Sequence, residues 1–173
     1  MELMTRYYDE DIVLKRAVDI VCPAQVSRRV ALFYIHGGGW RAGARDGFHR
    51  HACVSINGPA TLEKWEPMHE GIKRDIENLL GVTYEEESPL FRDASPMAYA
   101  EGEAADFLFL LAGKEKFFPH SFIYEMSEKL QRLSKRSEVV LFPEAEHGFF
   151  YGVGSPLQQE ALTVLEPFLE SYA

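Results

Sequence analysis

The sequence predicts an α/β fold, a mostly parallel sheet flanked by helices, as a single domain over residues 1–173. Apolar runs alternate with one-sided helical patterns in the second half, which is typical of parallel strands joined by crossover helices. A length of 173 residues fits one domain at roughly 150 residues each. With 46% hydrophobic residues, the chain can bury a real core.

The first half contains three predicted strands. Residues 11–22 mix alternating and β-branched positions, and residues 29–35 (RVALFYI) form a short apolar run that ends in glycines. Residues 52–56 (ACVSI) are a third short apolar segment, closed by the turn Asn57-Gly58-Pro59. Residues 71–80 then keep helical spacing, and Gly81 stands where a helix C-cap glycine is expected.

The second half predicts a strand, a helix, a strand and a helix. Residues 106–112 (DFLFLLA) are almost wholly apolar, as a strand covered on both faces would be, and residues 138–142 (EVVLF) form the next strand. Pro167 should kink the last helix or confine its final turn. The two helices are marked by apolar stripes, Phe122, Met126, Leu130 and Leu133 for the first and Leu157, Ala161, Leu165 and Phe168 for the last.

Charge and cysteine content exclude several classes of partner. The chain has 18 basic against 27 acidic residues, and its net charge of −9 would repel nucleic acids and anionic membranes. Cys22 and Cys53 are too few for a disulfide framework, so we expect two reduced, buried thiols. The first residues carry acids where a signal peptide would be apolar, and no run reaches the ~18 apolar residues of a membrane span. We therefore expect a cytoplasmic protein.

Two motifs follow predicted strands and suggest chemistry. His36-Gly37-Gly38-Gly39-Trp40 comes directly after residues 29–35, and its glycines let backbone N–H groups approach a developing negative charge. His147 lies in Glu144-Ala145-Glu146-His147-Gly148-Phe149, just after residues 138–142. A histidine in a loop at the carboxyl end of a strand can act as a general base. The alternatives are a flexible glycine turn and a structural histidine.

Taken in order, four segments resemble the α/β-hydrolase fold. They are HGGGW at residues 36–40, Asp93-Ala94-Ser95-Pro96, AGKEKFFP at residues 112–119 and FPEAEHGF at residues 142–149. The likeness is to the esterase and lipase branch, which includes acetylxylan-esterase-like and feruloyl-esterase-like enzymes, and it extends from about residue 10 to the C-terminus.

The resemblance implies roles for seven residues. Gly37, Gly38 and Gly39 would donate oxyanion N–H groups, His147 would be the general base, and no cofactor is implied. The acid of the family follows Gly-x-x, which places Lys116 at its position, and Glu115 is the nearest carboxylate. Glu115 either orients His147 or is a solvated surface residue. The remaining two, His36 and Trp40, would line the substrate pocket.

The chain departs from the family at the nucleophile. No serine stands in a G-x-S-x-G pentapeptide, and only residues 41–51 separate HGGGW from the predicted strand at 52–56. The sequence therefore resembles an α/β hydrolase with a shortened centre. Loss of central strands would expose sheet edges, so we expect a homodimer.

Two functions fit these observations. One is serine-dependent hydrolysis of a small, acetyl-like carboxylic ester, in which Ser55 is displaced into the site or another chain supplies the nucleophile. The other is a non-catalytic scaffold or binding protein that keeps the architecture alone. Metal binding by His49 and His51, with His69 and His120 elsewhere, lacks an accompanying cysteine or carboxylate cluster and is the weaker alternative.

Overall fold

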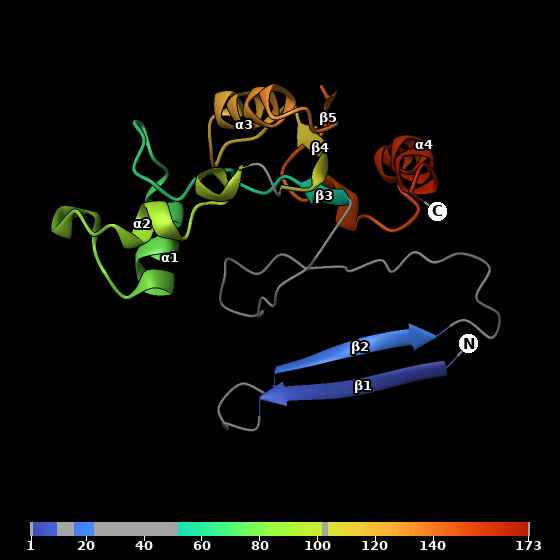
Figure 1. Cartoon of the computed structure of the whole chain (residues 1–173), viewed down its shortest axis with the longest axis horizontal. Helices are drawn as coiled ribbons and strands as arrows, with labels where there is room; N and C mark the ends of the chain where they lie inside the picture. The colour runs from blue at the N-terminus through green and yellow to red at the C-terminus, as the bar shows by residue number, and fades with distance from the viewer. Residues whose placement is uncertain (1, 10–15, 23–51, 102–103, 173) are drawn as a thin grey trace. The chain divides into compact units, whose positions relative to one another are not determined.

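The computed structural model describes residues 2–9, 16–22, 52–101 and 104–172 (Figure 1). In the last two of these ranges it also describes the side chains. The chain divides into two compact units, residues 1–48 with residue 173 and residues 49–172. The single domain over residues 1–173 stays a prediction.

An antiparallel hairpin forms the described part of the first unit. Strand β1 (Glu2–Asp9) pairs with β2 (Arg16–Cys22), and the register shifts between Tyr7 and Asp9. Strand β2 lies within the segment predicted at residues 11–22, of which residues 11–15 lie outside the described residues. Strand β1 was not predicted, because its acidic and polar residues interrupt any clear alternation.

A parallel sheet forms the centre of the second unit. Strands β3 (Ala52–Ile56), β4 (Asp106–Ala112) and β5 (Ser137–Phe142) pair in the order β3-β4-β5. This arrangement confirms the predicted α/β class with a parallel sheet. Because the strands are parallel, their carboxyl ends meet at one edge, where ligands commonly bind in open α/β sheets.

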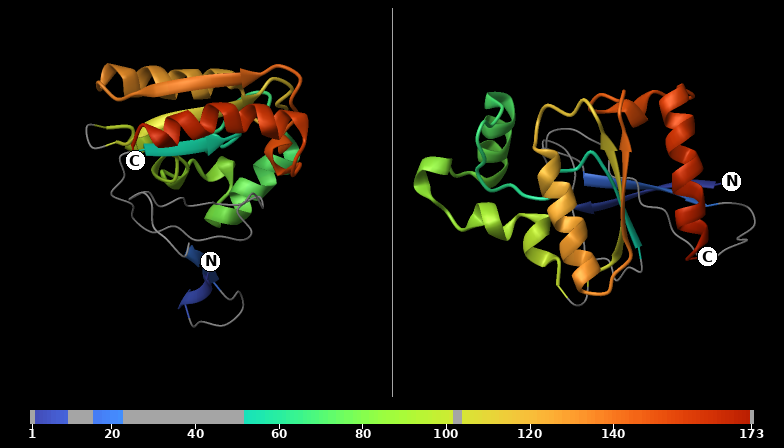
Figure 2. Two further views of the ribbon diagram at one scale, coloured as in Figure 1. Left: turned by 90° about the vertical axis from the view of Figure 1, so that its right-hand side faces the viewer. Right: turned by 90° about the horizontal axis from the view of Figure 1, so that it is seen from above.

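Helices cover both faces of this sheet (Figure 2). Helix α3 (His120–Arg132) packs on the face that carries Phe109 and Leu111, and α4 (Pro156–Glu170) packs on the opposite face. Strand β4, whose last five residues are buried, is therefore covered on both sides. Pro167 lies in the final turn of α4, one of the two outcomes that the sequence predicts.

A helical segment connects β3 to β4. It contains α1 (Glu70–Leu80), η1 (Tyr84–Glu86), α2 (Leu90–Asp93) and η2 (Pro96–Tyr99). Helix α1 was predicted together with its cap, since Gly81 adopts the left-handed conformation at φ 72°. The three short elements after it were not predicted, because three or four residues are too few to show a periodic pattern.

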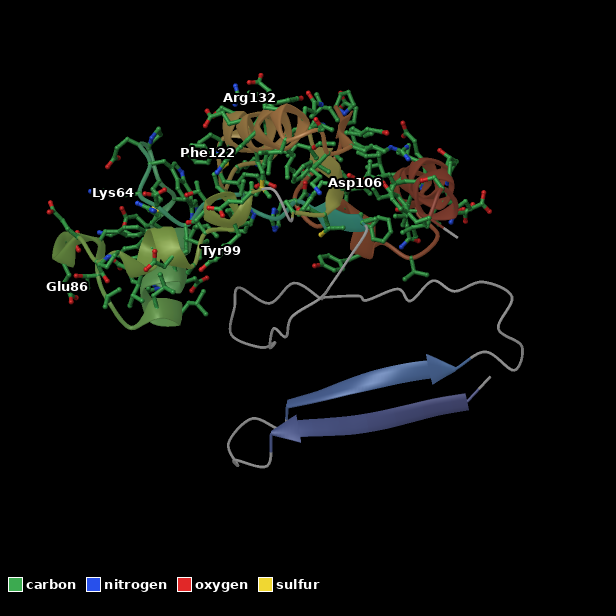
Figure 3. All side chains as sticks on the ribbon, viewed as in Figure 1. Lys64, Glu86, Tyr99, Asp106, Phe122 and Arg132 are labelled. Carbon is green, nitrogen blue, oxygen red and sulfur yellow. The ribbon has the colours of Figure 1, made fainter. Side chains whose placement is uncertain are left out.

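Aromatic packing and buried hydrogen bonds hold the helical segment together. Tyr84 stacks on Phe91 at 4.1 Å between ring centroids, and its hydroxyl donates to the Leu62 carbonyl at 2.7 Å. The buried Ser95 hydroxyl accepts from Leu62 N, also at 2.7 Å. Phe122 of α3 faces this segment (Figure 3), and its ring contacts Trp65 edge to face at 5.7 Å.

Candidate active site

Two short loops lie side by side at the carboxyl edge of the sheet. Gly113 N donates to Phe142 O at 2.8 Å, and Lys114 N donates to Ala145 O at 2.9 Å. A Cβ on Gly113 would lie 2.4 Å from Pro143 O, so only glycine allows this approach. The loop after β4 is thereby fixed against the loop after β5.

Glu115, on the first of these loops, is fully hydrogen-bonded and its side chain is 0% exposed. Its Oε1 accepts from Lys116 N and Phe117 N, both at 2.9 Å, and its Oε2 accepts from His147 Nδ1 at 2.7 Å. The interpretation of Glu115 as a solvated surface residue is therefore wrong. Lys116, at the position where the family has its acid, is exposed.

These contacts keep Glu115 ionised. Burial alone would raise the pKa of its carboxyl group, but the hydrogen bonds from His147 and from the Phe117 and Lys116 N–H groups outweigh it. The net effect is a pKa below the ordinary value of 4.5, so the group is a carboxylate at neutral pH.

His147 stands between this buried carboxylate and solvent. Its Nδ1–H donates to Glu115, which places the lone pair of the neutral ring on Nε2, and the side chain is 42% exposed. Gly148, at φ 82°, supplies the left-handed turn directly after it. An imidazole with a carboxylate on Nδ1 and an accessible Nε2 can take up and return a proton.

Phe117 fixes the imidazole from the side, and sequence reasoning missed this residue. Its ring meets His147 edge to face, with centroids 4.7 Å apart at 88°. His69, the N-cap of α1, contacts Phe117 in the same manner at 5.4 Å, and its Nδ1 accepts from Gly71 N. A second histidine therefore contacts the same phenylalanine ring as His147.

The remaining predicted site residues lie outside the described residues. They are the proposed oxyanion donors Gly37, Gly38 and Gly39 and the proposed pocket residues His36 and Trp40. Their roles stay predictions.

The nucleophile is not found among the described contacts. From residue 52 onward, no serine hydroxyl hydrogen-bonds to His147. Ser55 lies on β3, with its Oγ 2.9 Å from the position of a Cβ built on Gly58. The serines that the structure describes are Ser55, Ser88, Ser95, Ser121, Ser127, Ser134, Ser137, Ser155 and Ser171.

The described ranges contain neither a metal-binding cluster nor a membrane-spanning helix. There, no three His, Cys, Asp or Glu side chains come close enough to hold a metal ion. His120, one of the histidines considered as a ligand, instead contacts the Ala112 carbonyl through Nε2 at 3.0 Å. Cys53 is half-buried rather than buried. No described helix is both long and apolar enough to span a membrane.

The parallel sheet and the helices that flank it form part of an α/β-hydrolase-like fold. No protein-family model matches the sequence, and no curated protein matches it. The fold is instead shown by solved structures.

Three solved structures illustrate the likeness. Thermogutta terrifontis esterase 2 phosphonylated by sarin aligns with TM-score 0.59 and 20% identity over 76% of this chain and 49% of that chain. Its propionate-bound form aligns with TM-score 0.53 and 21% identity, over 71% and 43%. Pyrococcus horikoshii acylaminoacyl peptidase aligns with TM-score 0.57 and 23% identity, over 69% and 20%. The chain thus spans less than half the length of these proteins.

Proposed function

We propose that the protein hydrolyses carboxylic esters of small acyl groups, with His147 as general base and Glu115 as the carboxylate that orients it. The observation that carries the proposal is the bond of 2.7 Å between His147 Nδ1 and a Glu115 carboxylate with no exposed side-chain surface. The resemblance to esterases supports it, and the propionate-bound state of one structural neighbour supports a short acyl chain.

The proton transfers follow from the imidazole tautomer. His147 Nε2 takes the proton of an attacking hydroxyl as that oxygen bonds to the acyl carbon, and Glu115 stabilises the resulting imidazolium. The imidazolium then gives this proton to the alcohol as the ester C–O bond breaks. A water molecule repeats both steps and releases the acid. Backbone N–H groups of Gly37 and Gly38 would bind the oxyanion.

The attacking hydroxyl is proposed to come from a displaced Ser55 or from another chain. A second copy is the simplest source, since β3 stands at one end of the described strand order and all five of its residues are only half-buried. We therefore also propose a homodimer. Light scattering at micromolar concentration tests it, and a clean monomer would reject it.

Hydrolysis of p-nitrophenyl acetate tests the proposed function. The His147→Ala variant should lose activity by about a thousandfold or more, because the general base is removed. Glu115→Gln should lose about a hundredfold or more, since an amide no longer selects the tautomer with a free Nε2 lone pair. A fluorophosphonate probe, located by mass spectrometry, should label one serine and so identify the nucleophile.

His69→Asn is the matched control. This variant removes the exposed imidazole that also contacts Phe117, while asparagine still provides an N-cap for α1. It should hydrolyse the ester at the wild-type rate. Equal rates in all four proteins would show that surface imidazoles react unspecifically and would reject the proposal.

The second candidate is a non-catalytic binding protein. One observation favours it: the sequence has no G-x-S-x-G, and no described serine contacts His147. Absence of probe labelling, together with unchanged hydrolysis in His147→Ala, would select this alternative.

A further inference from the structure

Asn57 is a buried polar residue at the carboxyl end of β3, and the proposed reaction does not use it. Its residue surface is 7% exposed. Its backbone N donates to Leu110 O at 3.0 Å, and its side-chain Oδ1 accepts from Ala112 N at 2.7 Å. The pairing of β3 with β4 ends at Ile56 and Leu110, so Asn57 continues it with a side-chain oxygen.

Ala112 begins the turn that carries Glu115. The Ala112 carbonyl accepts from Glu115 N at 3.3 Å and from His120 Nε2 at 3.0 Å. The backbone N–H and carbonyl groups of this fully buried residue are therefore both hydrogen-bonded. Asn57 accepts from the N–H group, and Glu115 N and the His120 ring donate to the carbonyl. A change at Asn57 would act on Glu115 through a single residue.

The conformation of Asn57 carries two energetic costs. Its backbone is left-handed at φ 49°, which asparagine tolerates better than most residues but which is still unfavourable. Its Nδ2 is buried and has no hydrogen-bond partner among the residues that the structure describes. The amide cannot simply be reversed, because Nδ2 would then face the Ala112 N–H donor. Strained and unsatisfied groups of this kind are retained mainly where function requires them.

We propose that Asn57 is a positioning residue that holds the loop of Glu115, and through it the His147 imidazole, in the geometry for proton transfer. This inference rests on the proposed function for its catalytic consequence. Its structural claim, that Asn57 controls the environment of Glu115, can be measured without any ester.

The experiment compares Asn57→Gly with Ser95→Ala. Glycine accepts the left-handed backbone and removes only the side chain. Ser95 is a matched control, because its buried oxygen also accepts from a backbone N–H at 2.7 Å but lies in the helical segment. Carbon-13 NMR of the glutamate carboxyl groups gives the pKa of Glu115 in each protein, and p-nitrophenyl acetate gives kcat and KM.

In Asn57→Gly the pKa of Glu115 should rise toward its ordinary value, because the N–H groups that hold the carboxylate lose their fixed geometry. In an active enzyme kcat should fall about tenfold or more with KM unchanged. Ser95→Ala should leave the pKa and kcat at wild-type values, although it destabilises the fold. If Asn57→Gly does not fold, His120→Ala removes the other side-chain hydrogen bond to Ala112. It should raise the pKa of Glu115 in the same direction.

An unchanged pKa of Glu115 in Asn57→Gly, or the same change in Ser95→Ala, would overturn the proposal. A shifted pKa in a protein that hydrolyses no ester would uphold the control of Glu115 by Asn57. Such a result would reject only the proposed hydrolase function.

Discussion

A buried or half-buried carboxylate lies at each end of β4, and the two carboxylates differ in the groups that donate hydrogen bonds to them. At the amino end, Asp106 accepts from Arg136 N at 2.8 Å and from the Tyr172 hydroxyl at 2.7 Å. At the carboxyl end, Glu115 accepts from two backbone N–H groups and from His147. The first carboxylate binds a backbone N–H and a tyrosine hydroxyl, whereas the second binds two backbone N–H groups and an exposed imidazole.

The amino end serves to attach α4 to the sheet. The Arg136 guanidinium lies 4.9 Å from the Phe168 ring centroid and donates to Ser171 Oγ at 2.8 Å. Together with the Tyr172 hydroxyl, these contacts fix the last turn of α4 beside β4 and β5. We therefore interpret this polar cluster as structural, because its contacts attach α4 to the sheet.

Gly113→Ala should have the largest effect on stability, because it disrupts the packing of the loop after β4 against the loop after β5. The added Cβ would meet Pro143 backbone atoms between 2.4 and 2.7 Å away, which forces the two loops apart. We expect a loss of about 3 kcal/mol of unfolding free energy, measured by urea denaturation. Gly81→Ala is the control: it meets no atom within 4 Å, so only its left-handed backbone costs energy, about 1 kcal/mol. Equal losses would contradict the close packing of the loops.

The sequence predicts the periodic parts of the second unit well. The bounds of β3 and β4 are those expected, and β5 begins one residue earlier than expected. Such continuous apolar runs have few alternatives once both faces of a strand are covered. The short elements after α1 were missed, because hydrogen bonds over a long sequence separation stabilise them, such as that from Tyr84 to Leu62.

Of the predicted site residues, the structure describes Glu115 and His147 and brings them together at 2.7 Å. Glu115 lies one residue before the family's acid position, yet it reaches His147, because glutamate has one methylene more than aspartate and Gly113 lets the loops approach. Phe117 and Asn57 were not singled out, since their roles depend on contacts between strands. An asparagine before glycine at a strand end was the one available signal for Asn57.

Glu115, at the carboxyl end of β4, should make the stability of the protein depend on pH in the acid range. Glu115 has a lowered pKa in the folded protein, so its stabilisation is complete above about 4.5 and is lost as the pH falls through the folded value. Glu115→Gln should therefore cost about 1.5 kcal/mol at neutral pH, and the difference from wild type should shrink in acid. Glu144→Gln, in an exposed pair with Lys114, should change stability little at any pH. A Glu115→Gln effect that does not depend on pH would show that charge is not involved.

Tyr172→Phe should have a smaller effect, confined to the amino end. Burial and the hydrogen bond to Asp106 raise the pKa of Tyr172 to about 12 from an ordinary value of 10.0. Its contribution is complete below about pH 10 and is lost as the pH rises toward 12, the reverse of the dependence at Glu115. At neutral pH we expect a loss of about 1 kcal/mol in urea denaturation, with ester hydrolysis unchanged. Tyr124→Phe, on the exposed side of α3, should cost less. If Tyr172→Phe slowed hydrolysis without unfolding the protein, the two ends would be coupled through β4, and the amino end would not be purely structural.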